Sequence, residues 1–471
     1  MSHLKAWLSN RTKKQMGINA FSLLFGIIIF TALLSYILPA GSYERIDVDG
    51  RKVIVPESFQ FTKTDPIDFF DIFNSIHTGM VDASSIIFYV LIVGGAFGII
   101  MATGAINAFI SMLAQKLSNK EKLIIPIFML LFGAAGALMA MAEETLVYIG
   151  ILIPIALALG FDRIVGLAMV SVGASVGFTA AIMNPFTVGV AQGIAELPTF
   201  SGMGFRIVLF IALYIVAVIY VYRYAGKVKK DPSIGFYGDN NLSKNEATSI
   251  DLNTKMETRH KWVLLVFLLN FIVLVFGVTK YGWFLTEIAG LFLFFAIIIG
   301  LVGGESPNDI ADHFVKGAGN LIGGALIIGF AQAILVLLNS AGLMDTILYY
   351  SSAAIDSLPS TFTTIGMFFL QMFLNFFIPS GSGQAALTMP IMAPLSDLVG
   401  ITRQTAVLAF QLGDGISNMI FPTSGFFMAG LALAGIPWGR WIKWIFPFIL
   451  IEITIAIVAL LIAQWIHYGP F

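Results

Sequence analysis

Residues 122–160 form a long apolar run whose polar interruption, Glu143, Glu144 and Thr145, stands at its middle. A helix needs about 20 apolar residues to cross the hydrocarbon core of a bilayer, and this run is close to twice that length. The pattern predicts a re-entrant hairpin that turns inside the membrane and leaves on the side from which it entered. Because irregular backbone at that depth is tolerated only against protein or beside a wet cavity, the turn is a candidate functional site.

The composition places the whole chain in the membrane class. Hydrophobic residues make up 58% of the sequence and charged residues 11%, with a mean hydropathy of +0.89, whereas soluble domains usually carry about 25% charged residues. No basic patch indicates nucleic-acid binding, and the absence of cysteine excludes disulfides and thiolate metal sites. The histidines lack metal-ligand spacing and are predicted at the surface or the membrane interface: His3, His77, His260, His313 and His467.

The apolar segments predict an all-α polytopic protein with about nine crossings and two re-entrant hairpins. The first run exceeds the 7–15 residues typical of a signal-peptide core, so we expect it to remain as a membrane helix. Crossings are expected at 17–39, 82–103, 163–197, 205–225, 261–279, 281–303, 318–340, 403–435 and 441–467, hairpins at 122–160 and 361–399, and interfacial helices at 66–80, 105–118 and 343–357.

Lysine and arginine gather in alternate loops, which predicts the orientation. The loop 341–360 carries neither residue type. The N-terminus is therefore expected in the cytoplasm and the C-terminus outside the cytoplasmic membrane. The segments assigned to the cytoplasm are 1–16, 104–121, 226–260, 304–317 and 436–440.

The two halves of the chain show the same order of elements. Residues 1–225 form the first predicted repeat, 226–260 a polar cytoplasmic linker, 261–279 a connecting transmembrane helix and 281–471 the second repeat. The connecting helix turns the second repeat over, so the repeats are expected to be inverted, with hairpins entering from opposite sides. Inverted repeats with helices broken near the midplane are typical of secondary transporters. At an offset of 240, Ile151, Pro154, Gly160, Arg163 and Gly173 meet Ile391, Pro394, Gly400, Arg403 and Gly413.

Four polar breaks in the apolar segments are expected to converge: the two hairpin tips and the interruptions of 163–197 and 403–435. A half-helix that begins inside the membrane presents N–H groups to an anion, and one that ends there presents carbonyls to a cation. Glycines let the backbone approach a ligand closely. The predicted substrate-binding residues are Glu143, Glu144, Thr145, Asn184, Pro185, Thr187, Ser380, Gly381, Ser382, Gly383, Gln384, Asp414, Asn418, Thr423, Ser424 and Gly425.

The charge near these breaks is acidic. Glu143 and Glu144 form one break, Asp414 precedes another, and no lysine or arginine adjoins any of the four in the sequence. This balance favours a cationic or zwitterionic substrate over an anionic dicarboxylate. Other roles stay open, because Glu143 or Glu144 can cap the returning half-helix or carry a proton. Asp414 can be a hydrogen-bond partner between helices, and Asn184 can satisfy freed backbone groups.

The segment 379–425, PSGSGQAALTMPIMAPLSDLVGITRQTAVLAFQLGDGISNMIFPTSG, with MAEET at 141–145 and LPAGSYER at 38–45, resembles the YfcC branch of the anaerobic C4-dicarboxylate carrier and arginine–ornithine antiporter family. That family is similar to the broader ion-transporter superfamily. The resemblance implies inverted repeats, a scaffold and a transport domain, a homodimer and an elevator motion. The superfamily often carries Ser-Asn-Thr motifs at its tips and breaks, and this chain departs from them, which leaves coupling to Na⁺ or H⁺ open.

The sequence therefore predicts a secondary active transporter of the cytoplasmic membrane for amino acids, with basic ones such as arginine or ornithine preferred. A symporter or antiporter of C4-dicarboxylates or other carboxylates is the alternative. An ion channel is less favoured, because inverted repeats with opposed hairpins suit alternating access. An enzyme is not expected, since no catalytic constellation adjoins the breaks. The expected partners are a small-molecule substrate, the lipid bilayer and a second copy of the chain, with no cofactor, metal or nucleic acid.

Overall fold

The computed structural model describes residues 20–48, 51–116, 121–142, 145–235, 255–281, 283, 285–356 and 360–469. Glu143, Glu144, His3 and most of the predicted linker 226–260 lie outside these ranges. Within them, seven helices are long and apolar enough to cross a membrane. The chain is therefore a multi-pass α-helical membrane protein.

The first half of the chain places four short strands between its first two long apolar helices. Its elements are α2 (Ala20–Leu34), β1 (Gly41–Ser42), β2 (Arg45–Val48), β3 (Arg51–Ile54), β4 (Gln60–Phe61), α3 (Phe69–Asp82), α4 (Ser84–Ala102), α5 (Ala105–Lys116), η1 (Glu121–Leu123), α6 (Ile124–Met139), α7 (Leu146–Ala158), α8 (Arg163–Ala180), α9 (Val188–Ile194) and α10 (Met203–Lys230).

The second half is helical throughout the part that the structure describes. Its elements are η3 (Pro232–Ile234), α12 (Thr258–Tyr281), α13 (Leu285–Val302), α14 (Pro307–Ser340), α15 (Leu343–Asp356), α16 (Ser360–Asn375), α17 (Gly381–Leu398), α18 (Arg403–Ser417), α19 (Gly425–Ala434) and α20 (Trp438–Trp465).

Several predicted bounds need correction. Helix α14 begins well before the predicted residue 318, because Ser306 is its N-cap, Pro307 is its first residue and Asp309 completes a capping box with Ser306. Helix α10 continues to Lys230, so the predicted linker 226–260 starts inside a helix. The polar segment after α2 also contains two unpredicted two-stranded antiparallel sheets, β1 with β4 and β2 with β3. His260 is only 4% exposed, so its predicted surface position is wrong.

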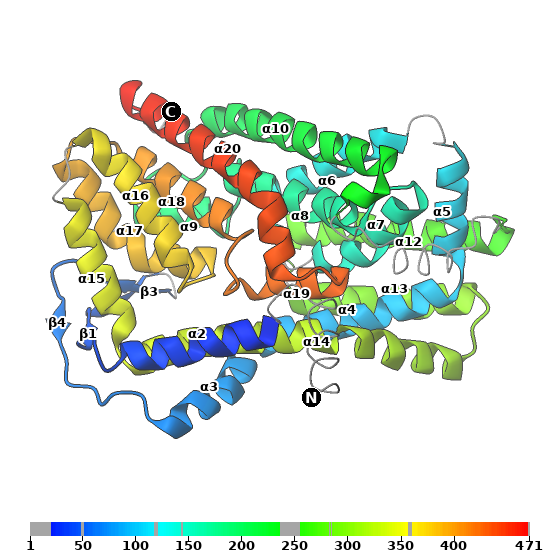
Figure 1. The fold of residues 1–471 in the computed structure, drawn as a ribbon, viewed down its shortest axis with the longest axis horizontal. Coiled ribbons are helices and arrows are strands. Elements are labelled where there is room, and N and C mark those ends of the chain that lie inside the picture. The colour runs from blue at the N-terminus through cyan, green and yellow to red at the C-terminus, as the bar shows by residue number, and fades with distance from the viewer. Residues whose placement is uncertain are drawn as a thin grey trace, which may run out of the picture.

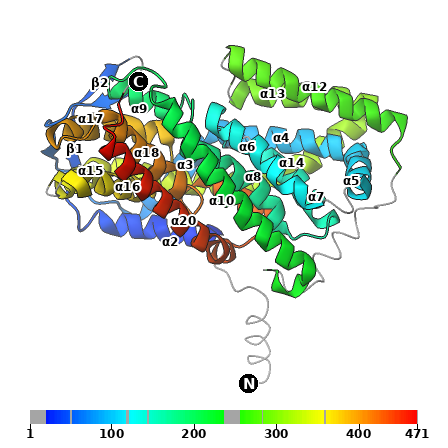
Figure 2. The same ribbon diagram turned by 90° about the horizontal axis from the view of Figure 1, so that it is seen from above.

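The helices form two layers with two clusters between them (Figure 1). In that view α2, α4 and α14 lie along the bottom, α10 and α20 along the top, and α16–α18 and α6–α8 to the left and right. Figure 2 shows α12 and α13 at one edge, on the side away from α16 and α17. Backbones of α4 and α14 touch, since a Cβ at Gly98 would lie 2.3 Å from the His313 carbonyl oxygen and one at Gly317 2.4 Å from that of Gly94.

Helices α8 and α18 lie at the centre of the molecule. The apolar window of α8 is 78% buried, against 33–56% for the other six candidate spans, and every residue of α18 from Gln404 to Ser417 is buried. The two helices cross in backbone contact, because a Cβ at Gly415 would lie 2.5 Å from the Cα of Thr179. Side chains on these helices are therefore shielded from the surroundings of the protein.

The helices of the two halves pack in matching pairs. Helix α6 packs on α8 and α16 on α18, while α7 contacts α19 and α17 contacts α9. Glycines at equivalent positions permit the first two contacts: a Cβ at Gly173 would lie 2.9 Å from the Cα of Met129, and one at Gly413 would lie 2.8 Å from the carbonyl oxygen of Phe368. The short helices α9 and α19 thus each contact a longer helix of the other half, α17 and α7 respectively.

Candidate functional site

The tip between α16 and α17 approaches α18 and the loop before α9. Ser380 is the N-cap of α17, and its hydroxyl accepts a hydrogen bond from the Gly383 amide at 3.3 Å. A Cβ at Gly381 would lie 2.4 Å from Thr187 Cγ2 and 3.0 Å from Asp414 Oδ2. The chain therefore needs glycine at 381 for this approach, whereas Ser382 and Gly383 are exposed.

The remaining predicted residue of this tip, Gln384, ties the two arms of the hairpin together. Its side chain is fully buried, and Nε2 donates to the backbone oxygen of Gln371 at 2.9 Å and to its Oε1 at 2.7 Å. The amide faces α16 rather than Asp414. The hydrogen bonds of Gln384 therefore stabilise the conformation of the tip.

Asn184 stabilises the turn in the loop between α8 and α9. Helix α8 ends at Ala181, which has a left-handed backbone with φ of 45°. Asn184 Oδ1 then accepts from the amides of Phe186 at 2.9 Å and Thr187 at 3.0 Å, as asparagine does in turns. Asn184 thus satisfies freed backbone groups, one of the roles that the sequence left open. Pro185 in the same loop is exposed.

Asp414 is the charged residue where the second tip and this loop meet. It is fully buried; its Oδ1 accepts from Asn418 Nδ2 at 3.2 Å, and its Oδ2 has no hydrogen-bond partner among the described residues. Thr187 Oγ1, which is also buried, likewise lacks a partner there. Two side chains that each carry an oxygen without a partner among the described residues therefore adjoin Gly381.

Asn375 fixes the end of α18 below this carboxylate. Its Nδ2 donates to the backbone oxygen of Asp414 at 3.2 Å, to Ser417 Oγ at 2.7 Å and to Asn418 Oδ1 at 3.0 Å. Asn418 is therefore oriented from both sides, by Asn375 and by Asp414. The sequence did not single out Asn375, although an amide in an apolar hairpin arm is a signal that could have found it.

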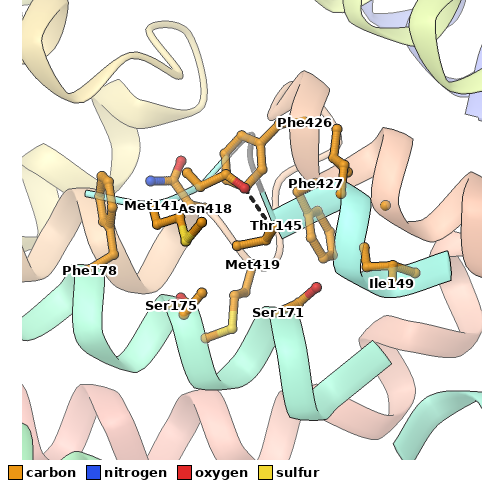
Figure 3. Close-up of a pocket in the computed structure, with 14 residues that line it drawn as sticks. Met141, Thr145, Ile149, Ser171, Ser175, Phe178, Asn418, Met419, Phe426 and Phe427 are labelled. Atoms are coloured by element: carbon orange, nitrogen blue, oxygen red, sulfur yellow. Dashed lines mark hydrogen bonds between the residues drawn. The ribbon is translucent and has the colours of Figure 1, made fainter. Parts of the chain in front are cut away.

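The first tip and the fourth break enclose a small cavity of about 30 Å³ (Figure 3). Thr145 closes the turn by donating from its hydroxyl to the Ala142 oxygen at 2.5 Å, and Ser171 and Ser175 face the same space from α8. Asn418 also lines it, and so links the cavity to Asp414. This volume holds one or two water-sized species and no amino acid, so a substrate requires the cavity to widen.

The fourth break faces the lower layer rather than Asp414. Thr423 and Ser424 are buried, and their hydroxyls have no partner within the described residues. A Cβ at Gly425 would lie 3.1 Å from the Cα of Ile328 in α14. The predicted site thus divides into a part around Asp414 and a part around the cavity, joined through Asn418.

One arginine lies near a break although the sequence shows none there. Arg206 in α10 is 1% exposed and donates to the backbone oxygens of Ile182 at 3.2 Å, Phe200 at 3.2 Å and Ser201 at 2.8 Å. It also donates to the Tyr468 hydroxyl at 3.3 Å. Since the other three acceptors are carbonyls, Arg206 stabilises the backbone beside the second break. The sequence does not predict this contact, because Arg206 is far from the break along the chain and reaches it only where α10 folds back over α8.

The fold is that of a multi-pass helical membrane protein whose central site is built from interrupted helices. The model of the DcuC family, described as C4-dicarboxylate anaerobic carrier, matches residues 18–465. The chain belongs to this family of membrane transporters.

Two relatives match over almost their whole length. YfcC of Escherichia coli (strain K12), named as a candidate basic amino acid antiporter, is 34% identical over 92% of this chain and 94% of its own. An uncharacterized protein of Haemophilus influenzae (strain ATCC 51907 / DSM 11121 / KW20 / Rd) is 30% identical over 93% of this chain and 96% of its own. The predicted resemblance to the YfcC branch is therefore confirmed.

Two solved structures are more distantly similar. The YdaH transporter of Alcanivorax borkumensis is 16% identical with a TM-score of 0.45, covering 96% of this chain and all of that one. MtrF of Neisseria gonorrhoeae is 19% identical with a TM-score of 0.43 and 96% coverage of both chains. At these scores neither structure determines how the helices of this chain are arranged.

Proposed function

We propose that this chain is a secondary active transporter of amino acids that prefers basic ones such as arginine or ornithine. The observation that carries this proposal is Asp414, a fully buried carboxylate with one oxygen unpartnered among the described residues. A carboxylate buried in this way is either neutralised by a proton or paired with a cation. A guanidinium or ammonium group matches that requirement, and the name of the E. coli relative adds support.

The two halves are proposed to be inverted repeats, each with a re-entrant hairpin and an interrupted helix. The matching contacts of α6 with α8 and α16 with α18, and of α7 with α19 and α17 with α9, support this symmetry. The domain bounds remain those of the sequence, with repeats at 1–225 and 281–471. The proposed transport step is an elevator motion in which both hairpins and both broken helices move past α4 and α14. The protein is proposed to be a homodimer.

The alternative is a carrier of C4-dicarboxylates, which the family description favours. Helix α17 begins at Gly381 and α19 at Gly425, both beside the site, so each presents backbone N–H groups that suit a carboxylate. Asp414 acts against this alternative, since a dianion would meet an acidic side chain.

The coupling ion is proposed to be H⁺ or Na⁺, held by Asp414 Oδ2 and the Thr187 hydroxyl.

Counterflow into proteoliposomes tests the function. Vesicles loaded with unlabelled arginine should accumulate labelled arginine or ornithine with saturable kinetics, and labelled succinate should stay outside. Asp414→Asn removes the charge with little change in shape and should lower arginine exchange at least tenfold, since an unpaired partner of a buried ion pair costs about 2–5 kcal/mol. Asp82→Asn, an exposed carboxylate at the end of α3, is the matched control.

Each outcome selects one reading. Succinate exchange without arginine exchange replaces the amino-acid proposal with the dicarboxylate alternative. Non-saturable flux through wild-type protein identifies a channel. Full arginine exchange by Asp414→Asn would show that this carboxylate does not bind the substrate. It would then have either a coupling role or a structural role. Accumulation driven by a proton or sodium gradient distinguishes these two roles, because only a coupling residue is needed for it.

A further inference from the structure

A second, larger cavity lies between the lower layer and the central cluster. It measures about 590 Å³ and is bounded by α4 and α14 on one side and by α7 and α19 on the other. This volume falls within the roughly 300–1,000 Å³ of small-molecule sites. Most of its lining is apolar, including Tyr89, Phe97, Met101 and Leu433. None of these residues belongs to the site around Asp414.

Apart from the Tyr89 hydroxyl of α4, the polar side chains of this cavity come from one stretch of α14. His313, Lys316 and Asn320 all line it, and residues three and four apart share one face of a helix. Lys316 forms no salt bridge within the described part of the chain, although Asp312 precedes it by one turn. His313 Nδ1 lies 3.6 Å from Glu305 Oε2, so the neighbouring carboxylate belongs to the histidine. Among the described residues Lys316 is therefore a positive charge without an ion-pair partner, beside an amide.

The wall that carries Lys316 is fixed. Gly317, the next residue, packs its backbone on Gly94 of α4, and a Cβ there would lie 2.4 Å from the Gly94 oxygen. The cavity therefore does not depend on a rearrangement between α4 and α14.

The larger cavity adjoins the small cavity between the first tip and the fourth break. Leu146, the first residue of α7, lines both cavities, next to Thr145 of the first tip. Helix α19 also borders both, at Gly430 for the small cavity and at Leu433 for the large one. The two cavities are therefore neighbours along α7 and α19.

We propose that this cavity is a second substrate site, in which Lys316 and Asn320 bind the carboxylate group of the transported molecule next to the central site. The assignment rests on the proposed transport function, but it applies to any carboxylate substrate. An amino acid would present its carboxylate to Lys316 and its cationic end to the acidic central site. An ammonium or guanidinium compound without a carboxylate would lose the first contact.

Discrimination between arginine and arginine amide tests this role. Hydrogen bonds to charged groups contribute about 1.5–3 kcal/mol, and the lower figure suits a residue as exposed as Lys316, so the wild type should prefer arginine about tenfold. Lys316→Gln should raise the KM for arginine about tenfold and leave competition by arginine amide unchanged. Lys316→Arg should restore most of the preference. Lys261→Gln, an exposed lysine of α12 that lines neither cavity, is the control and should match wild type.

The outcomes separate this site from the proposed function. If succinate rather than arginine is transported, the amino-acid proposal fails, yet Lys316→Gln should still raise the KM for succinate. If Lys316→Gln keeps full discrimination, or weakens arginine and its amide equally, the second site is overturned while transport stands. Loss of co-purified phospholipid from Lys316→Gln with unchanged discrimination would assign the cavity to a lipid head group instead. A wild type that takes up neither arginine nor succinate overturns both proposals.

Discussion

Arg163 and Arg403 make the same contact in the two halves of the molecule. Arg163, the first residue of α8, donates from Nη1 to the oxygen of Ala434 at the end of α19 at 2.9 Å. Arg403, the first residue of α18, donates from Nη1 to the oxygen of Ala195 just after α9 at 3.1 Å. Carbonyls at a helix C-terminus lack intrahelical partners and carry partial negative charge. Each central helix therefore stabilises the short half-helix of the other half.

Removal of either arginine should weaken the fold, and Arg403→Ala also breaks ion pairs with Glu196 and Asp397. Arg163→Ala and Arg403→Ala should each lower the free energy of unfolding by about 1–2 kcal/mol, because the carbonyl loses a charged donor. Arg223→Ala is the control, since this exposed arginine of α10 makes no hydrogen bond or ion pair within the described residues and such surface changes usually stay within about 0.5 kcal/mol. Thermal unfolding in detergent measures all three. Equal, small shifts in the three variants would contradict a shared capping role.

The approach of the second tip to α18 should depend on Gly381 and not on Gly383. A Cβ at 381 would overlap Thr187 Cγ2 at 2.4 Å, while the nearest atom to one at 383 is Ser380 Oγ at 3.1 Å. Gly381→Ala should thus abolish exchange in proteoliposomes with normal yield of protein, and Gly383→Ala should be active. Thr187→Ser removes the overlapping methyl group, so the double variant Gly381→Ala with Thr187→Ser should recover exchange. Normal exchange by Gly381→Ala alone would show that the close approach is not needed.

The breaks in the helices could be predicted because their causes are local. Proline, glycine and polar residues inside apolar runs indicated turns near 142–145, 184–187, 380–384 and 422–425, and helices end or begin beside each of them. Apolar length likewise predicted the long helices. The bounds of α14 were missed because the stretch after Pro307 is polar, and hydropathy does not register a capping box.

The contacts between the breaks could not be predicted in the same way. Asp414 meets Gly381, and Arg206 meets Ile182, only because α8 and α18 cross and α10 folds back on them. Lys316 was counted as a loop lysine, and its place in a cavity follows from the packing of α14 on α4. Long-range packing of this kind leaves no periodic trace in a single sequence.

The orientation can be tested cleanly because the chain has no cysteine. Ser42 in β1 and Ser233 after α10 are both exposed, and the predicted topology places them on opposite sides of the membrane. In intact cells a membrane-impermeant maleimide should label Ser42→Cys and leave Ser233→Cys unlabelled until the cells are opened. The cysteine-free parent is the background control. Labelling of Ser233→Cys from outside would reverse the orientation, and with it the side assigned to each hairpin.

The charge of the first tip should decide between substrate classes. Ala142 and Thr145 line the central cavity, and Glu143 and Glu144 lie between them in the sequence. If one carboxylate pairs with a cationic substrate, Glu143→Gln or Glu144→Gln should weaken arginine binding by about 2–5 kcal/mol, or roughly 30- to several-thousand-fold, at every pH.

If a carboxylate of this pair carries a coupling proton instead, the glutamine variant mimics its protonated form, keeps exchange and loses only proton-driven accumulation. Exchange and accumulation measured side by side in proteoliposomes distinguish the two roles. Normal transport by both variants, with a wild type that accepts succinate and rejects arginine, would refute the cationic substrate. Lys316 would then be the more important charge of the transport route, because a dicarboxylate must be met by a cation on its way to an acidic site.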